Sequence, residues 1–309
     1  MTGIVQEQKG IWDRPTLVKE GGCWAKSDIQ QIRESEDAQE IPMDFTAWGQ
    51  RNAQMITGNG MERQEEGKVL ELMGSSANVL RGGTVLQAED KEGCLIGSTL
   101  AQKLFGSTEA KGQYVRYGER NLRIAGVLES YPNVLVVQWD GVHDSVLNRI
   151  SISGEAQSTI DAFSLRNSIT PVRAEYSMWK DEATLLYNLL PFSFLLWMVY
   201  VCLHMRREWI SRKGYALPLY LVMLAAVVIF FRCFPIDLES LRDFMPGKWS
   251  DFSYYGTYIQ SKMQAADLLD SMEKTVVEQA MTAGLMPLKG LVLVGELIFL
   301  DFCVKYRKK

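Results

Sequence analysis

The sequence lacks the common signatures of catalysis. It contains no G-x-x-x-x-G-K-[ST] stretch, so the chain carries no P-loop, and it contains no G-x-S-x-G nucleophile turn. Histidine is scarce: only His143 and His204 occur, and His143, beside Asp144, is more typical of a surface turn than of a metal ligand. We therefore expect no catalytic residue, cofactor or metal in this chain.

Excess positive charge and abundant cysteine are also missing. The 33 Lys and Arg against 37 Asp and Glu give a net charge of −4, which argues against a general nucleic-acid binder. Of the five cysteines, Cys202, Cys233 and Cys303 lie in apolar runs, and Cys23 and Cys94 lie in the polar part. If that part is outside the cytoplasm, Cys23 and Cys94 have the opportunity to form a disulfide, but the sequence leaves this open.

Long apolar runs are absent from the first 180 residues and frequent after Thr184. A membrane span needs about 20 mostly apolar residues, and we predict spans at 185–203, 215–234 and 285–304. The alternative is buried helices of a soluble protein, but the first two runs are too long and too poor in charge for that. The third span is the weakest, because charged residues interrupt it at Lys289, Glu296 and Asp301.

Basic residues predict the orientation of these spans. Four Lys and Arg lie between the first two spans, and four more follow the third, in 305–309. Because basic residues concentrate in short cytoplasmic segments, both clusters are expected in the cytoplasm, which places residues 1–183 and the loop 235–284 outside. The residues of the first cluster that we single out are Arg206, Arg207, Glu208, Arg212 and Lys213.

The amino terminus does not explain how such a domain leaves the cytoplasm. Residues 1–22 contain no apolar stretch of the kind that a secretory signal has. Either the first span translocates the domain in reverse, or the sequence lacks an amino-terminal helix, and we expect the second.

One acidic residue is expected near the middle of the third span. A charge there costs about 2.5–3.5 kcal/mol on insertion scales, so Glu296 requires a reason. It serves a function, as a polar contact with another helix or subunit or as a proton-linked site, or it is protonated or paired inside the bundle and serves packing only. We favour packing. Arg232 and Lys289 are expected near the outer face, where they can meet Asp237 or lipid phosphates.

The first 183 residues alternate irregularly between helical and strand patterns, which predicts an α+β domain followed by three transmembrane α-helices. Ser98 is expected to cap a helix at 99–105 that ends at Gly106, and Ser27 to cap a helix at 27–34. Strands are expected at 48–57, 115–117, 122–126 and 133–139. In the outer loop, 257–283 has a helical pattern that predicts packing on the core domain or at the membrane surface.

One stretch of this domain resembles a known family. Residues 90–128 read DKEGCLIGSTLAQKLFGSTEAKGQYVRYGERNLRIAGVL, and this is similar to the MacB-type periplasmic core domain of FtsX-like ABC transporter permeases, most clearly over 79–128. From the residues alone, a buried phenylalanine beside a helix-ending glycine is ordinary core construction. The positions that match the family pattern are Gly97, Leu100, Ala101, Leu104, Phe105, Gly106, Gly112, Gly126 and Val127.

The resemblance implies a permease-like transmembrane subunit that works in a homo- or hetero-dimer, surrounded by membrane lipid and docked on a separate cytoplasmic ABC ATPase subunit. The ATPase would face the basic cytoplasmic loop, although the same charges also serve to anchor the spans. Two features depart from the family pattern: no helix precedes the domain, and the cytoplasmic loop is short. A membrane-anchored binding or scaffold protein that has lost ATPase coupling therefore remains the alternative.

Overall fold

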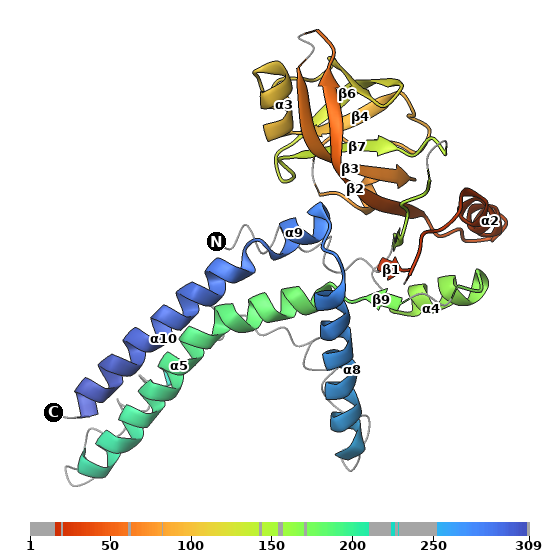
Figure 1. Ribbon diagram of the computed structural model, residues 1–309. Helices are drawn as coiled ribbons and strands as arrows, with labels where there is room; N and C mark the ends of the chain where they lie inside the picture. Colours follow the sequence, from red (N-terminus) through yellow and green to blue (C-terminus); the bar gives the residue numbers. More distant parts are fainter. Residues whose placement is uncertain are drawn as a thin grey trace. The chain divides into compact units, whose positions relative to one another are not determined.

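A computed structural model describes residues 16–19, 21–60, 63–81, 83–141, 144–153, 157–169, 172–209, 224–225, 228 and 252–307. The chain divides into two compact units. The first unit combines Met1–Ser177 with Ala265–Thr282, and the second combines Met178–Gln264 with Ala283–Lys309. A segment from near the carboxyl terminus therefore belongs to the amino-terminal unit (Figure 1).

In the described part of the chain, nine strands form one sheet in the order β3-β7-β4-β6-β5-β2-β8-β1-β9. The strands are β1 (Thr16–Val18), β2 (Phe45–Gly58), β3 (Gln64–Met73), β4 (Gly93–Gly97), β5 (Tyr114–Tyr117), β6 (Arg120–Leu128), β7 (Val134–Gln138), β8 (Arg149–Ile152) and β9 (Val172–Ala174). The helices of this unit are α2 (Lys26–Asp37), the 3-10 turn η1 (Ser76–Asn78), α3 (Ser98–Phe105), α4 (Gln157–Arg166) and α9 (Val276–Thr282).

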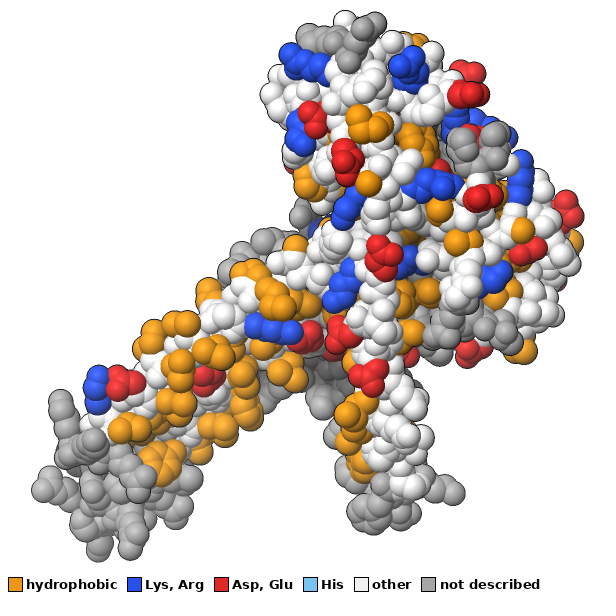
Figure 2. Space-filling view, in the orientation of Figure 1, with side chains coloured by type: hydrophobic (Ala, Val, Ile, Leu, Met, Phe, Trp, Pro, Cys, Tyr) orange, Lys and Arg blue, Asp and Glu red, His pale blue; other side chains and the backbone are white. Residues whose placement is uncertain are grey.

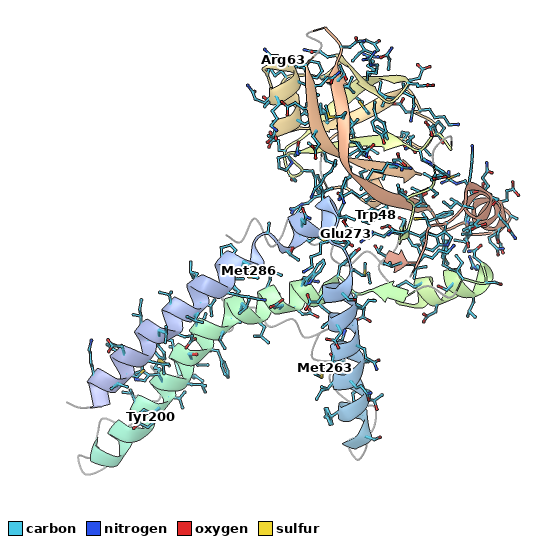
Figure 3. The ribbon with its side chains drawn as sticks, in the orientation of Figure 1. Trp48, Arg63, Tyr200, Met263, Glu273 and Met286 are labelled. Carbon is cyan, nitrogen blue, oxygen red and sulfur yellow. The ribbon has the colours of Figure 1, made fainter. Side chains whose placement is uncertain are left out.

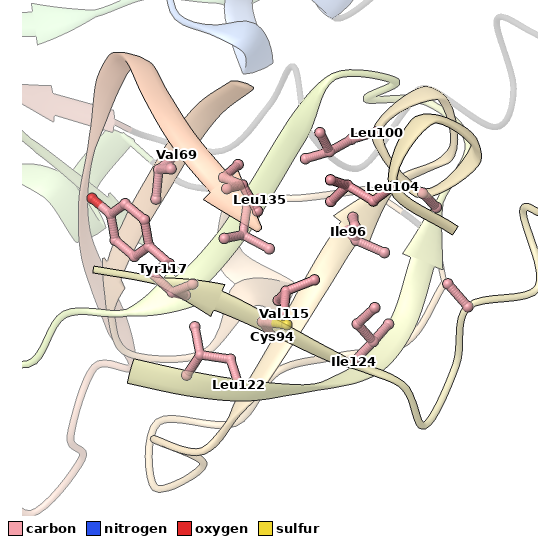
Figure 4. Close-up of a cluster of buried hydrophobic side chains, with 14 of the residues drawn as sticks. Val69, Cys94, Ile96, Leu100, Leu104, Val115, Tyr117, Leu122, Ile124 and Leu135 are labelled. Carbon is pink, nitrogen blue, oxygen red and sulfur yellow. The ribbon is translucent and has the colours of Figure 1, made fainter. Parts of the chain in front are cut away.

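Part of this sheet closes into a barrel, because β3 also pairs with β2. The closed circuit runs β2-β3-β7-β4-β6-β5 and back to β2, with parallel pairing of β3 with β7 and of β4 with β6. Alternate side chains of these strands point inward and form an apolar core (Figure 4). Helix α3 packs into the same core through Leu100, Leu104 and Phe105, so it plugs the barrel.

The remaining strands extend the sheet beyond the barrel. The amino-terminal half of β2 pairs with β8, which pairs with β1, which in turn pairs with the edge strand β9. Helices α2 and α4 cover this extension with a second core that includes Phe45 and Phe163, whose rings meet edge-on at 5.3 Å. The buried carboxylate of Glu36 joins the two helices by accepting hydrogen bonds from Met43 N and from Asn167 Nδ2, while Arg166 lies 3.6 Å away.

The second unit contains α5 (Ser177–Trp209), the first part of α8 (Phe252–Ser271) and α10 (Leu285–Arg307). Apolar side chains cover the visible surface of α5 and α10 (Figure 2). Among the described residues, two segments are long and apolar enough to cross a membrane, namely Ser177–Val201 with 25 residues and Val276–Lys305 with 30. The predicted span at 215–234 lies almost entirely outside the described residues.

Two predicted helix caps are wrong. Helix α3 begins at Ser98 itself, after Gly97, and no side chain caps it. Helix α2 begins at Lys26, and its capping residue is Ala25, not Ser27. The N–H of Ala25 donates to Asp28 Oδ2. In α3 the residue directly before Ser98, and in α2 the residue two positions before Ser27, already has the extended backbone of a cap, so each serine falls inside the first turn.

Other local predictions are confirmed. Gly106 ends α3 with a left-handed φ of 74°. The hairpin of β5 and β6, the strand β7 and the long strand β2 lie where the alternation predicted them. The expected helix at 257–283 forms as two helices, α8 and α9, separated by Met272–Thr275, and α9 packs on the core domain through Val277.

Candidate functional site

The most unusual feature of the first unit is a buried ion pair between residues far apart in the sequence. Arg149, the first residue of β8, and Glu278, in the first turn of α9, are both almost fully buried, with side-chain exposures of 4% and 2%. Their contact is bidentate, with Arg149 Nε 2.9 Å from Oε1 and Nη2 3.2 Å from Oε2. Buried charges of this kind are stable only when all their polar atoms are paired, so the surrounding groups must supply the remaining hydrogen bonds.

Every polar atom of this pair has a partner. Tyr176 Oη donates to Glu278 Oε1 at 2.5 Å, and Thr275 donates to Oε2 through both its backbone N–H and its hydroxyl, at 2.7 and 3.0 Å. Arg149 also donates to the Glu273 carbonyl oxygen at 2.9 Å, and its guanidinium lies 5.3 Å from the Trp48 ring centroid. We call this set the clasp: Trp48, Arg149, Tyr176, Glu273, Thr275 and Glu278 (Figure 3 labels Trp48 and Glu273).

The clasp continues inward as a chain of buried hydroxyl and indole groups. Trp48 Nε1 donates to Ser151 Oγ at 2.8 Å, and Ser151 Oγ lies 3.0 Å from Thr16 Oγ1. These residues belong to β2, β8 and β1, so one polar network joins three strands to α9 and to the residue that precedes α5. Burial, and then the Glu278 carboxylate, hold the pKa of Tyr176 well above its usual value of 10. Tyr176 therefore stays a hydrogen-bond donor at physiological pH.

Around the clasp, the segment that leads into α9 is held by amide side chains. Gln50 Oε1 accepts a hydrogen bond from Val276 N at 2.7 Å, Asn52 Nδ2 donates to Glu273 Oε1 at 2.9 Å, and Lys68 Nζ lies 3.0 Å from Gln279 Oε1. Two cavities of about 680 and 290 Å³ flank this segment. The segment is thus held mainly by its hydrogen bonds and by Val277 beneath α9, rather than by packing on every side.

The residues at 97–127 that match the family pattern, called the matching stretch below, make packing contacts and no polar side-chain contacts. Leu100, Ala101, Leu104 and Phe105 fill the barrel, and Val127 packs against the same core. Gly97 allows close approach of the backbone, because a Cβ there would lie 2.2 Å from the Tyr131 carbonyl oxygen. A Cβ on Gly126 would lie 2.4 Å from Thr84 Oγ1, and Gly112 has a φ of 86°. All of these roles are packing or backbone roles, in agreement with the packing interpretation.

The other residues singled out from the sequence lie apart from the clasp. Arg206, Arg207 and Glu208 continue α5, which runs to Trp209, but their side chains lie outside the described residues, as do Arg212 and Lys213 entirely. Glu296, in α10, lies 2.8 Å from Ser193 Oγ of α5. Cys23 and Cys94 are both free; Cys94 lies inside the barrel, where burial raises the pKa of its thiol to about 12.

Sequence reasoning missed the clasp, although part of it has a local signal. Thr275-Val276-Val277-Glu278 has the spacing of a capping box, in which the acidic side chain bonds back to the N–H of the first residue. That pattern predicts the start of α9 at Val276. It gives no indication of Arg149 or Tyr176, which lie 129 and 102 residues away from Glu278.

Comparison with known proteins now identifies the first unit. A family model described as the MacB-like periplasmic core domain matches residues 5–172, which is more than half of the chain. The chain belongs to the MacB-like periplasmic core domain family. No curated protein sequence matches it.

Two solved structures are similar to this MacB-like chain. The extracellular domain of the noncanonic ABC-type transporter YknZ from Gram-positive bacteria is 15% identical, with a TM-score of 0.37 over 52% of this chain and 97% of that one. The periplasmic region of MacB from Actinobacillus actinomycetemcomitans is 12% identical, with a TM-score of 0.41 over 57% of this chain and 96% of that one.

The match to the family also places the clasp within the chain. The MacB-like region includes Arg149 and Trp48, but it ends at residue 172, before Tyr176 and Glu278. Two of the six clasp residues therefore lie inside the family domain, and four lie in the segments that lead to α5 and α10.

Proposed function

We propose that this chain is a transmembrane subunit of an ABC-type transporter, in which the MacB-like domain stands outside the cytoplasm and moves with the membrane helices. Membership of the MacB-like family and the two apolar helices support this proposal. The proposal assigns ATP hydrolysis to a separate cytoplasmic subunit, as the family relationship implies.

The observation that carries the proposal is the way the chain runs from the clasp into the apolar helices. Tyr176 directly precedes the first residue of α5, and α9, which holds Glu278, is separated from α10 only by Ala283 and Gly284. Both apolar helices are thus tied by short connections to one buried ion pair on β8. In this proposal, the short connections from Tyr176 into α5 and from α9 into α10 carry a displacement of either helix to the residues that pair with Arg149.

The ATPase would meet the cytoplasmic end of the membrane domain at Arg206, Arg207, Glu208, Arg212 and Lys213, and lipid would surround the spans. A second permease chain would complete the assembly as a homo- or hetero-dimer. The ATPase and the second chain follow from family relationship, and this chain's own contribution is the clasp and the two helices that leave it.

The test is co-purification from native membranes in mild detergent. A stoichiometric P-loop ATPase is expected with the unmodified chain. Substitution of Arg212 and Lys213 by glutamine should release it, whereas the same change at Lys308 and Lys309, which have the same charge but follow the last span, should not. Reproducible absence of an ATPase from the unmodified chain would instead support the membrane-anchored binding or scaffold protein.

Coupling itself is tested with the clasp. In the complex with its ATPase, Glu278→Gln keeps the shape of the side chain but weakens its contacts with Arg149 and Tyr176. Basal ATP hydrolysis and membrane insertion should persist, while ATP-dependent change in protease accessibility of the barrel should fall. An equal ATP-dependent change in the variant and the parent would contradict the role of the clasp in coupling.

A further inference from the structure

The three charged residues that interrupt α10 each have a partner. Lys289 Nζ lies 2.5 Å from Glu182 Oε1 of α5, and Asp301 is paired at 2.5 Å with Lys305 of its own helix. Glu296, between them, lies 2.8 Å from Ser193 Oγ of α5. The residue that is costliest in a membrane is therefore satisfied by the neighbouring helix rather than by solvent.

The contacts between α5 and α10 follow a single parallel register. From the start of the helices onward, Glu182 meets Lys289, Leu190 meets Gly295, Ser193 meets Glu296, and Trp197 meets Phe299 and Phe302. Position along α5 and position along α10 increase together, so the two helices run in the same direction. At Gly295 the Leu190 side chain packs against the backbone of α10, and an added Cβ would lie 2.2 Å from Leu190 Cδ1.

A slip of one helical turn, about 5.4 Å, would break two neighbouring features at once. Glu296 would face Leu189 or Trp197 in place of Ser193, which leaves an acid without its hydroxyl partner in an apolar environment. Leu291 or Phe299 would then occupy the level of Gly295, where the Leu190 side chain would have to shift to make room. Apolar contacts alone tolerate sliding, so the polar pair and the glycine specify the register.

We propose that Glu296 is a positioning residue: its hydrogen bond to Ser193 fixes α5 and α10 in one register, so that the two helices move together. This rests on the proposed function in that α5 and α10 cross the membrane together. It assigns the intramembrane acid to helix alignment, not to the passage of protons or ions, because its partner is a serine hydroxyl on the packed face beside Gly295.

The register is measured by disulfide cross-linking of the full chain in membranes, with the five native cysteines replaced. Cysteines at Trp197 and Phe302 report the observed register, because the two ring centroids lie 5.3 Å apart and neither residue belongs to the polar pair or the glycine contact. Cysteines at Trp197 and Ile298 report a slip of one turn and serve as the matched control. In the parent, the first pair is expected to cross-link and the second to remain reduced.

Three variants distinguish the effect of the hydrogen bond between Ser193 and Glu296 from any effect of a charge on Glu296. Ser193→Ala should lower the ratio of in-register to slipped cross-linking about threefold, the size measured for hydrogen bonds between membrane helices. Glu296→Leu should lower it at least as much, whereas Glu296→Gln, which retains a hydrogen-bonding group, should restore the parent ratio. If Glu296→Leu fails to accumulate, Ser193→Ala and Glu296→Gln still decide the question.

Two results would overturn this role for Glu296. One is an unchanged cross-linking ratio in both Ser193→Ala and Glu296→Leu. The other is loss of ATP-dependent activity in Glu296→Gln with the ratio unchanged, which would mean that the charge itself takes part in function. The cross-linking needs no ATPase partner, so its outcome is independent of the co-purification result; release of the chain from membranes by alkaline extraction would instead contradict the proposed membrane placement.

Discussion

The barrel and the clasp both bury side chains, but different interactions stabilise the buried groups. Inside the barrel, the cluster around Leu104, Phe105 and Ile124 is apolar, and its stability comes from filled space. In the clasp, Arg149 and Glu278 are as deeply buried, but their stability depends on complete pairing. An apolar core tolerates small adjustments, whereas a buried ion pair is either made or broken, so the clasp is the better place for a discrete mechanical connection.

Removal of one charge of the clasp should have the largest effect in the first unit. Glu278→Leu leaves Arg149 buried without its counter-charge, and we expect unfolding free energy to fall by about 3–5 kcal/mol. The double variant, Arg149→Met with Glu278→Leu, removes the unpaired charge and should recover much of that loss. Denaturant unfolding of the detergent-solubilised chain, followed by Trp fluorescence, measures both. An equal loss in the single and double variants would show that packing, not pairing, holds α9.

The barrel should respond to truncation without any such rescue. Leu104→Ala opens a cavity between α3 and the strands and should cost about 2–5 kcal/mol in the same measurement. Leu165→Ala is the matched control, because that side chain is 80% exposed, and its cost should stay within about 0.5 kcal/mol. A cost for Leu104→Ala as small as that of the control would contradict the filled barrel.

The same contrast explains what the sequence could and could not predict. The helix at α3, its end at Gly106 and the hairpin of β5 and β6 follow from patterns within a few residues, so periodicity and glycine position found them. The clasp depends on Arg149 meeting Glu278, and no local pattern connects residues 129 positions apart. The insertion of β1 between β8 and β9 is likewise a property of the whole sheet.

The failed predictions have a common physical origin. Serine at the start of an apolar helical pattern favours a cap, but Gly97, directly before Ser98, and Ala25, two positions before Ser27, take the cap conformation. In α3 the close approach of Gly97 to the backbone at Tyr131, together with the bond from Leu100 N to Pro132 O, fixes where the helix starts. Tertiary contact therefore outweighs the local preference for a serine cap.

The barrel and the clasp each contain a tyrosine with a raised pKa, so alkaline pH should affect stability at both places. The pKa of Tyr117, at the barrel, is raised to about 12, and that of Tyr176, in the clasp, well above 10, in both cases first by burial and then by a glutamate. Because each tyrosine has a higher pKa in the folded chain than in the unfolded chain, its contribution to the free energy of unfolding is fully present below pH 10. For Tyr117 it is lost between pH 10 and about 12, and for Tyr176 it declines from pH 10 upward.

Removal of either hydroxyl should therefore flatten this alkaline loss of stability. Tyr176→Phe should also cost about 1.5 kcal/mol at neutral pH, because Glu278 loses a hydrogen bond. Tyr117→Phe should cost less, since its bond to Glu71 is longer, at 3.2 Å, and Arg51 also pairs with that carboxylate. Denaturant unfolding at pH 8 and at pH 11 provides the measurement. A loss between these pH values as steep in Tyr176→Phe as in the parent would contradict the burial of Tyr176.

The smallest effects should come from Gly106 and Gly112, because the glycines of the matching stretch divide by cause. Gly106 and Gly112 have φ values of 74° and 86° with little around them, so alanine at either should cost about 1 kcal/mol through backbone strain alone. Asparagine tolerates that conformation better, and Gly106→Asn should recover part of the loss. Gly97 has a φ that any residue adopts, so Gly97→Asn should recover nothing over Gly97→Ala, because its contact is with the backbone at Tyr131. Equal responses to asparagine at Gly106 and Gly97, measured by thermal unfolding, would remove the distinction between conformational and steric glycines in this stretch.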